Sequence, residues 1–129
     1  MNDGSRLGKI TTDYAYYGLA DPKLEQSERD YNDKANADAF IAAMWDVLDG
    51  AGNLLLKKHR DYGPSNIAGA PGGPLNGLRV RMWDKTARIN HLIDSGATPE
   101  NESLRASFID LLNYSAIALM VLDGKWPRE

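Results

Sequence analysis

The stretch NESLRASFIDLLNYSAIALMVLDG, residues 101–124, decides the fold that the sequence predicts. From Leu111 onward it is apolar on nearly every side, which is typical of a helix buried at the centre of a protein. Thr98 or Asn101 is suited to cap its start, and Gly124 is suited to end it. We therefore expect a central, buried helix here.

Two further helices are predicted upstream. The first covers about residues 36–60, where apolar side chains recur at helical spacing. Gly50 and Gly52 weaken it by roughly 1 kcal/mol each relative to alanine, so we expect a kink or a short break there. The second covers about residues 76–95, and Gly96 is placed to stop it.

The rest of the chain lacks a regular pattern. Residues 62–74, YGPSNIAGAPGGP, contain too much glycine and proline for a helix or a strand, so they predict a loop. Residues 1–34 read as a polar, tyrosine-rich arm. The sequence thus predicts an all-α domain over residues 35–129, a bundle of three main helices. Three helices with this much apolar surface bury it poorly alone, so we expect a homo-oligomer to complete the bundle.

Composition narrows the functional classes. The chain has 129 residues, which suits one domain, and it has no cysteine, which excludes disulfides and thiolate metal sites. Neither a secretory signal nor a run of about 18 apolar residues is visible. We therefore expect a cytoplasmic protein that does not contact a membrane.

Positive charge gathers at the centre of an acidic chain. Residues 57–88 contain seven basic and two acidic side chains, which gives +5, whereas the whole chain carries −3. The remainder is therefore −8. This distribution suits a compact anion such as a phosphate ester, and we do not expect direct nucleic-acid binding because the acidic flanks would repel it. Alternatively, the basic centre only neutralises the acidic helices around it.

Four charged residues share one face of the second predicted helix, namely Arg81, Asp84, Lys85 and Arg88. That face lies beside the apolar stripe, so these charges are expected at the edge of the core, where they need partners. One interpretation is a salt-bridge network that holds the bundle together. The other is a phosphate cradle in which Asp84 orients the basic side chains. Spacing alone favours the network.

The end of the first helix offers a second wall for such a site. Lys57, Lys58 and Asp61 share a face there, and Tyr62 and Gly63 lead into the loop. Charged residues at a helix end beside a glycine-rich loop are typical of a ligand pocket. The Tyr62 ring is suited to stack on a nucleobase, and its plainer role is to anchor the loop.

The third helix carries Asp110, Asn113 and Tyr114 on one face of its apolar half. A carboxylate there needs a cation nearby. A basic residue of the second helix can supply it. Alternatively, Asp110 binds Mg²⁺ together with Glu102, and the metal polarises a diphosphate for attack by water.

Three stretches make the chain resemble the phage-enriched family called nucleotide modification associated domain, type one. They are LLLKKHRDYGPSNI (54–67), GLRVRMWDKTARINHL (77–92) and NESLRASFIDLLNYSAIAL (101–119). That family is similar to the all-α, MazG-like nucleoside triphosphate pyrophosphohydrolases, oligomers that use carboxylates and magnesium. The resemblance implies a role in nucleotide metabolism, in the host cytoplasm if the gene is a phage's. The resemblance also favours the phosphate cradle over the salt-bridge network as the interpretation of the face that carries Arg81, Asp84, Lys85 and Arg88.

The chain departs from both patterns in its carboxylates. Ala106 stands one turn before Asp110, where members of the nucleotide modification associated family often have an acidic residue, and Asp46 and Asp49 stand where MazG-like enzymes have an ExxE pair. Because the chain has fewer carboxylates to hold a metal, we expect nucleotide binding more than nucleotide hydrolysis.

These patterns together predict a protein that binds a nucleotide or a related phosphorylated ligand. Magnesium-dependent hydrolysis of nucleoside triphosphates, with Asp110 and Glu102 as catalytic and metal-binding residues, is left open. The alternatives are a non-catalytic sponge for a nucleotide immune signal and a structural subunit of a DNA-modification assembly. The predicted ligand-binding residues are Lys57, Lys58, Asp61, Tyr62, Gly63, Arg81, Asp84, Lys85, Arg88, Asn113 and Tyr114.

Overall fold

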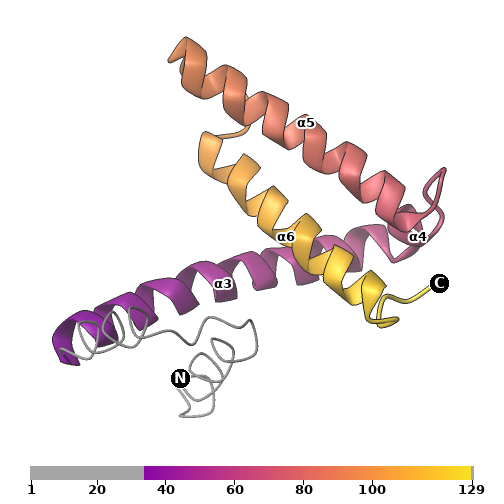
Figure 1. Ribbon diagram of the computed structural model, residues 1–129, viewed down its shortest axis with the longest axis horizontal. Helices are drawn as coiled ribbons and strands as arrows, with labels where there is room; N and C mark the ends of the chain where they lie inside the picture. The colour runs from indigo at the N-terminus through magenta and orange to yellow at the C-terminus, as the bar shows by residue number, and fades with distance from the viewer. Residues whose placement is uncertain (1–33, 129) are drawn as a thin grey trace, which may run out of the picture. The chain divides into compact units, whose positions relative to one another are not determined.

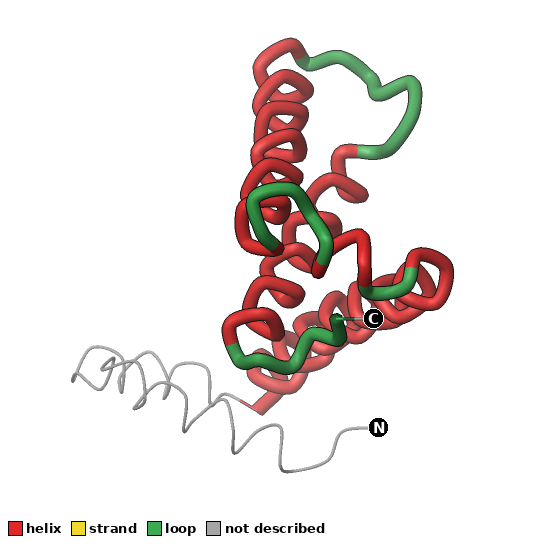
Figure 2. The backbone as a smooth tube through the Cα atoms, turned by 90° about the vertical axis from the view of Figure 1, so that its right-hand side faces the viewer, coloured by secondary structure: helices red, strands yellow, loops and turns green. Residues whose placement is uncertain are grey.

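The computed structural model describes residues 34–128, and within them every regular element is a helix (Figures 1 and 2). The elements are α3 (Lys34–Tyr62), α4 (Ser65–Ala68), α5 (Pro74–Ser95) and α6 (Leu104–Leu122). The all-α prediction with three main helices is therefore confirmed. The predicted tyrosine-rich arm lies outside the described residues but for its last one.

The chain divides into two compact units, Met1–Trp45 and Asp46–Glu129, with the boundary inside α3. The described part of the first unit is the beginning of that helix. The second unit contains the end of α3 and all of α4, α5 and α6, and the site described below lies entirely within it.

Helix α3 is unbroken at its glycines, so the short break that the sequence allowed does not occur. Ala51 lies between Gly50 and Gly52 and is buried, and its carbonyl oxygen accepts a hydrogen bond from Asn113 Nδ2 at 3.0 Å. The cost of two helical glycines is about 2 kcal/mol, and burial with this tertiary hydrogen bond offsets it.

The predicted loop contains a short helix, which corrects the sequence interpretation. Pro64 precedes α4, and its carbonyl oxygen accepts hydrogen bonds from the backbone N–H groups of Ile67 and Ala68. The Ile67 side chain is buried in the core. A glycine with positive φ, Gly63, allows the chain to turn out of α3 before this helical turn begins.

Helix α5 begins at Pro74, two residues before the predicted start, because proline is tolerated in the first turn, where its missing N–H costs nothing. Asn76 donates to the Pro71 carbonyl and accepts from Arg79 Nε. At the other end, Gly96 adopts a left-handed conformation with φ 64°, and this predicted stop is confirmed.

The start of α6 is capped by neither Thr98 nor Asn101 but by Ser103. The Ser103 hydroxyl accepts a hydrogen bond from the backbone N–H of Ala106 at 3.1 Å. Serine in an extended conformation directly before the first helical residue is a strong cap, and it fixes where the helix begins.

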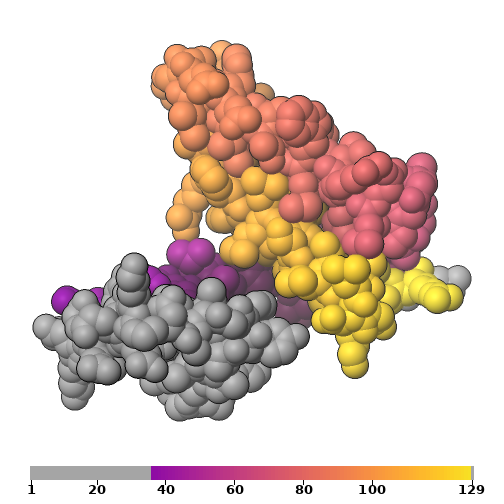
Figure 3. Space-filling view, viewed as in Figure 1, coloured from indigo at the N-terminus to yellow at the C-terminus, as the bar shows by residue number. Residues whose placement is uncertain are grey.

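The core lies where α4, α5 and α6 meet. Ile67, Leu78 and Ile117 are its buried centre, and side chains of α3, α6 and the C-terminal tail pack around them. Helices α5 and α6 run antiparallel and pack against each other (Figures 1 and 3). Helix α6 is not buried on every side as the sequence predicted, because Leu119 and Leu122 are exposed.

Long apolar helices remain partly uncovered. By length and composition alone, Asn36–Tyr62 and Leu104–Leu122 would suffice to cross a membrane, each with a mean hydropathy of 1.3. The core helix of a soluble protein meets the same requirement. The cytoplasmic location predicted from the sequence therefore stays a prediction.

Candidate functional site

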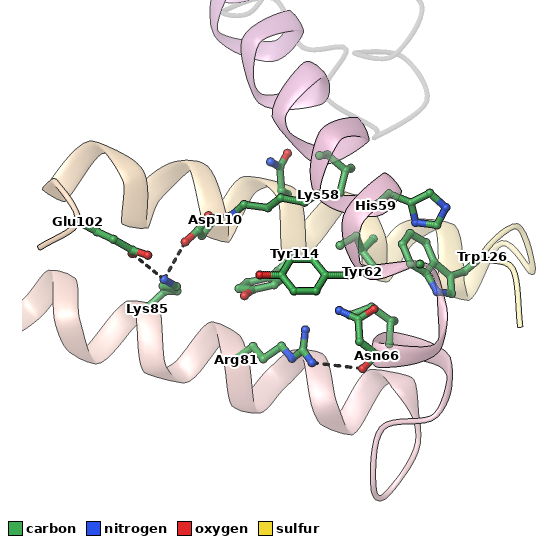
Figure 4. A pocket seen from close by; sticks show the side chains of 15 residues that line it. Lys58, His59, Tyr62, Asn66, Arg81, Lys85, Glu102, Asp110, Tyr114 and Trp126 are labelled. Atoms are coloured by element: carbon green, nitrogen blue, oxygen red, sulfur yellow. Dashed lines mark hydrogen bonds and ion pairs between the residues drawn. The ribbon is translucent and has the colours of Figure 1, made fainter. Parts of the chain in front are cut away.

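A cavity of about 410 Å³ lies among the end of α3, helices α4, α5 and α6, and the C-terminal tail (Figure 4). Charged side chains line one end and aromatic side chains the other, with Arg81 and Tyr114 between them. Its volume lies within the range of about 300–1,000 Å³ that is usual for small-molecule pockets. The cavity is thus large enough for a small organic ligand.

The charged end is a chain of ion pairs centred on Asp110. One of its carboxylate oxygens lies 3.1 Å from Lys58 Nζ and the other 2.7 Å from Lys85 Nζ. Lys85 Nζ also lies 3.0 Å from Glu102 Oε2. The side chains of Asp110 and Lys85 are only 10% and 18% exposed. Lys85 is therefore the basic residue of the second predicted helix that meets Asp110, as the first of the two interpretations of this carboxylate requires.

These contacts shift two pKa values in opposite directions. Burial alone would raise the pKa of Asp110, but hydrogen bonds from Lys85 and Lys58 outweigh it and lower the pKa below its ordinary value. Burial alone would lower the pKa of Lys85, but hydrogen bonds to Asp110 and Glu102 outweigh it and raise the pKa. Both groups therefore carry their charges at neutral pH.

Arg81 also lines the cavity, but unlike Lys58 and Lys85 it has no carboxylate partner among the described residues. Its Nη2 donates one hydrogen bond, to the backbone carbonyl of Asn66 at 3.2 Å, and it pairs with no carboxylate among residues 34–128. A guanidinium has five N–H donors, so most of its hydrogen-bonding capacity is unused here. A half-buried cation with open donors is a ready anchor for an anion.

Arg88 lies two turns further along α5 and is engaged by protein acceptors. It donates to the Ser107 hydroxyl at 2.6 Å and to the backbone carbonyls of Ser103 and Glu102. The Ser107 side chain is fully buried. Arg88 does not line the cavity and instead ties α5 to the start of α6.

The aromatic end is built from His59 and Trp126. Their rings are 5.1 Å apart and steeply inclined at 73°, and Trp126 Nε1 donates to the Pro64 carbonyl at 3.1 Å. Trp126 thereby packs the C-terminal tail against the helices. His59 Nδ1 is buried and has no hydrogen-bond partner among the described residues.

The structure brings most of the predicted site residues into one cavity. Those that line it are Lys58, Tyr62, Gly63, Arg81, Lys85, Glu102, Asp110, Asn113 and Tyr114. Lys57, Asp61, Asp84 and Arg88 lie outside its lining. Asp84 is exposed because six residues of helix place it about 120° around the axis from the buried Leu78. The expectation that it lies at the edge of the core is therefore wrong.

Sequence reasoning missed part of the lining. His59, Asn66 and Trp126 are not among the predicted site residues, yet all three line the cavity. These three side chains reach the cavity because α4 and the C-terminal tail lie against each other. The hydrogen bond that joins them links positions about 60 residues apart. Trp83, by contrast, does not line the cavity and is 63% exposed on α5.

The carboxylates do not present a ready magnesium site. Both oxygens of Asp110 contact lysine ammonium groups, and Lys85 stands between Asp110 and Glu102. Within residues 34–128, no three acidic, histidine or cysteine side chains gather as metal ligands would. A divalent cation would have to displace the lysines, so we derive no chemical step through it.

Comparison with known proteins gives one match. The sequence profile of the family described as nucleotide modification associated domain 1 matches residues 58–122, just over half of the chain. The matched range includes every predicted ligand-binding residue except Lys57. No curated protein matches the chain, and neither does any solved structure.

Proposed function

Because this chain belongs to the nucleotide modification associated domain 1 family, we propose that its cavity binds a nucleotide or a related phosphorylated small molecule. The observation that carries the proposal is Arg81, a half-buried guanidinium in the cavity with no carboxylate partner among the described residues. Leaving a cation without a counter-charge in a partly buried site is costly, and a bound anion removes that cost.

Further hydrogen-bond donors support a phosphate as that anion. An ammonium group has three N–H donors, of which Lys58 uses one and Lys85 two in the contacts described above. The remaining donors belong to side chains that line the same cavity as Arg81. Phosphate oxygens accept several charge-assisted hydrogen bonds at once, which suits such a set.

Binding without hydrolysis is the version that the contacts favour. A MazG-like reaction would need carboxylates free to hold magnesium, whereas Asp110 is held by two lysines and Ala106 removes a further acidic position. Non-catalytic binding of a nucleotide is therefore our preferred role, and a sponge that sequesters a nucleotide signal, such as one used against phage, is one form of it. Magnesium-dependent hydrolysis is the second candidate, motivated by the resemblance to MazG-like enzymes.

The proposal is tested by titrating the protein with nucleotides in a calorimeter. We expect Arg81→Ala to weaken binding by roughly 10- to 100-fold, the effect of about 1.5–3 kcal/mol for a hydrogen bond to a charged group. Arg79→Ala is the matched control, since Arg79 is exposed on the same helix and does not line the cavity. Absence of binding by the unaltered protein, to any nucleotide of the panel, would refute the proposal.

Hydrolysis is distinguished from sequestration by the fate of the ligand. The bound nucleotide is recovered after denaturation, and its phosphates are counted by mass spectrometry. Recovery of the intact molecule, with no pyrophosphate released in the presence of Mg²⁺, supports a sponge. Release of pyrophosphate that is abolished in Asp110→Asn supports the enzyme.

We also propose that the chain forms a homo-oligomer. Large apolar side chains are exposed on all three long helices, including Leu56 of α3, Trp83 of α5 and Leu119 of α6. A monomer rarely leaves so many exposed without a partner. Native mass spectrometry reports the number of subunits, and a purely monomeric protein at micromolar concentration would contradict this proposal. A partner of another kind, as in a DNA-modification assembly, would then be the remaining explanation.

A further inference from the structure

The two ends of the cavity differ in chemistry, and this difference narrows the ligand. We propose that the ligand is a nucleoside monophosphate, with its phosphate at Arg81 and the adjoining lysines and its base at the aromatic end beside His59 and Trp126. This inference rests on the proposed function and specifies the class of molecule bound there.

The charge of the cavity favours one phosphate over three. Three cations line it, Lys58, Arg81 and Lys85, and they face two carboxylates, Glu102 and Asp110, so the lining carries a net charge of +1. A single phosphate group brings about −1.5 to −2 charges at neutral pH, which this lining and its spare donors can accommodate. A triphosphate brings several more, and the carboxylates of Asp110 and Glu102 would repel them.

The aromatic end has the features of a base pocket. The rings of His59 and Trp126 both line the cavity and pack edge to face, 5.1 Å apart, which gives a base an aromatic wall. Tyr62, which also lines the cavity, has an exposed ring on which a base can stack.

Size and arrangement agree with a single nucleotide. The volume of about 410 Å³ lies at the small end of the usual range for ligand pockets, which leaves little room for a second nucleotide. Figure 4 places Arg81 on the α5 wall between the ion pairs and the aromatic end. A phosphate at Arg81 therefore leaves the aromatic end for the base.

The inference is tested by calorimetry on the full chain, with chelator present so that no metal contributes. The ligands are the four common deoxynucleoside 5′-monophosphates, their triphosphates, ribose 5-phosphate and inorganic phosphate. We expect at least one monophosphate to bind 10-fold or more tightly than both its triphosphate and ribose 5-phosphate. Tighter binding of the triphosphates overturns the inference. So does equal binding of ribose 5-phosphate, because the base would then contribute nothing.

A variant pair tests the base end separately. Tyr62→Ala removes the exposed ring on which the base stacks, so we expect weaker monophosphate binding and unchanged ribose 5-phosphate binding. Phe108→Ala, which removes an exposed ring of α6 outside the cavity, is the matched control and should alter neither. Unchanged monophosphate binding in a folded Tyr62→Ala protein refutes the stacking contact. If that variant does not fold, the ligand series with the unaltered protein decides alone.

The outcome separates this inference from the proposed function. Binding of inorganic phosphate or ribose 5-phosphate that is lost in Arg81→Ala, without any gain from a base, would support the anion site and reject the nucleoside monophosphate. Absence of binding by every phosphate compound would reject both.

Discussion

Arg81 and Arg88 occupy the same face of α5, two helical turns apart, yet their surroundings differ completely. Arg88 donates to a buried hydroxyl and to two backbone carbonyls, all at fixed positions at the start of α6. Arg81 donates once, to a carbonyl that precedes α5, and faces the cavity. The difference shows that one charged helix face can be part structural network and part open site, which periodicity cannot distinguish.

The reason lies in what faces each arginine. Beside Arg88, the chain returns from α5 into α6 and brings backbone carbonyls and Ser107 within reach. Beside Arg81, α5 and α6 are separated by the cavity, and no carboxylate of α6 pairs with this guanidinium. Removing a charge of this face should therefore destabilise the protein where the side chain contacts the start of α6. It should weaken ligand binding where the side chain faces the cavity.

The largest loss of stability is expected at the ion pairs between these two arginines. Asp110→Ala removes the carboxylate that Lys85 and Lys58 share, and leaves the mostly buried Lys85 with only the exposed Glu102. Breaking a buried pair in this way costs about 3 kcal/mol or more in the free energy of unfolding, measured by urea titration. Asp84→Ala, which removes an exposed carboxylate of α5, is the control and should change stability by less than about 0.5 kcal/mol. Equal losses in the two variants would mean that the ion pairs do not stabilise the fold.

Arg88→Ala is the next largest change. It leaves the buried Ser107 hydroxyl and two carbonyl groups without their donor, which costs about 1–3 kcal/mol. Arg81→Ala removes one hydrogen bond at a solvent-accessible cavity, so its cost should be about 1 kcal/mol or less. Thermal melting of the two variants side by side measures the contrast. A lower melting temperature for Arg81→Ala than for Arg88→Ala would reverse the assignment of the two residues.

The fold was largely predictable because its signals are local. The three long helices follow from apolar spacing, and Gly96 ends α5 where the sequence indicated. The errors concern features set by contacts between distant segments. Ala51 is held by Asn113 across 62 positions, so α3 continues through its glycines, and α4 forms where Ile67 reaches the core.

Only those residues of the candidate site that share a face of a long helix could be predicted from the sequence. A carboxylate in an apolar helix requires a cation, and a basic residue of the second helix was one of the two candidates for Asp110, Mg²⁺ being the other. The aromatic end of the cavity was not predictable, since Trp126 reaches the cavity through its hydrogen bond to the Pro64 carbonyl, 62 positions earlier. The separate roles of Arg81 and Arg88 likewise depend on the course of the α5–α6 connection. The spacing of residues along a helix carries no information about that course.

The smallest expected effect is that of pH on the ion pairs, and it is specific in direction. The pKa of Asp110 is lowered in the folded protein, so its contribution to stability is present above the ordinary carboxyl range and is lost as pH falls through the folded value. The pKa of Lys85 is raised, so its contribution is present below the ordinary lysine range and is lost as pH rises through the folded value. Between about pH 5 and 9 both groups stay charged, folded or unfolded. The difference in unfolding free energy between the unaltered protein and Asp110→Asn should therefore be flat across that window and shrink below about pH 4. Urea titrations of both proteins at each pH measure it, and a slope within the window would show that the Asp110 carboxylate is not held in its charged form by the two lysines.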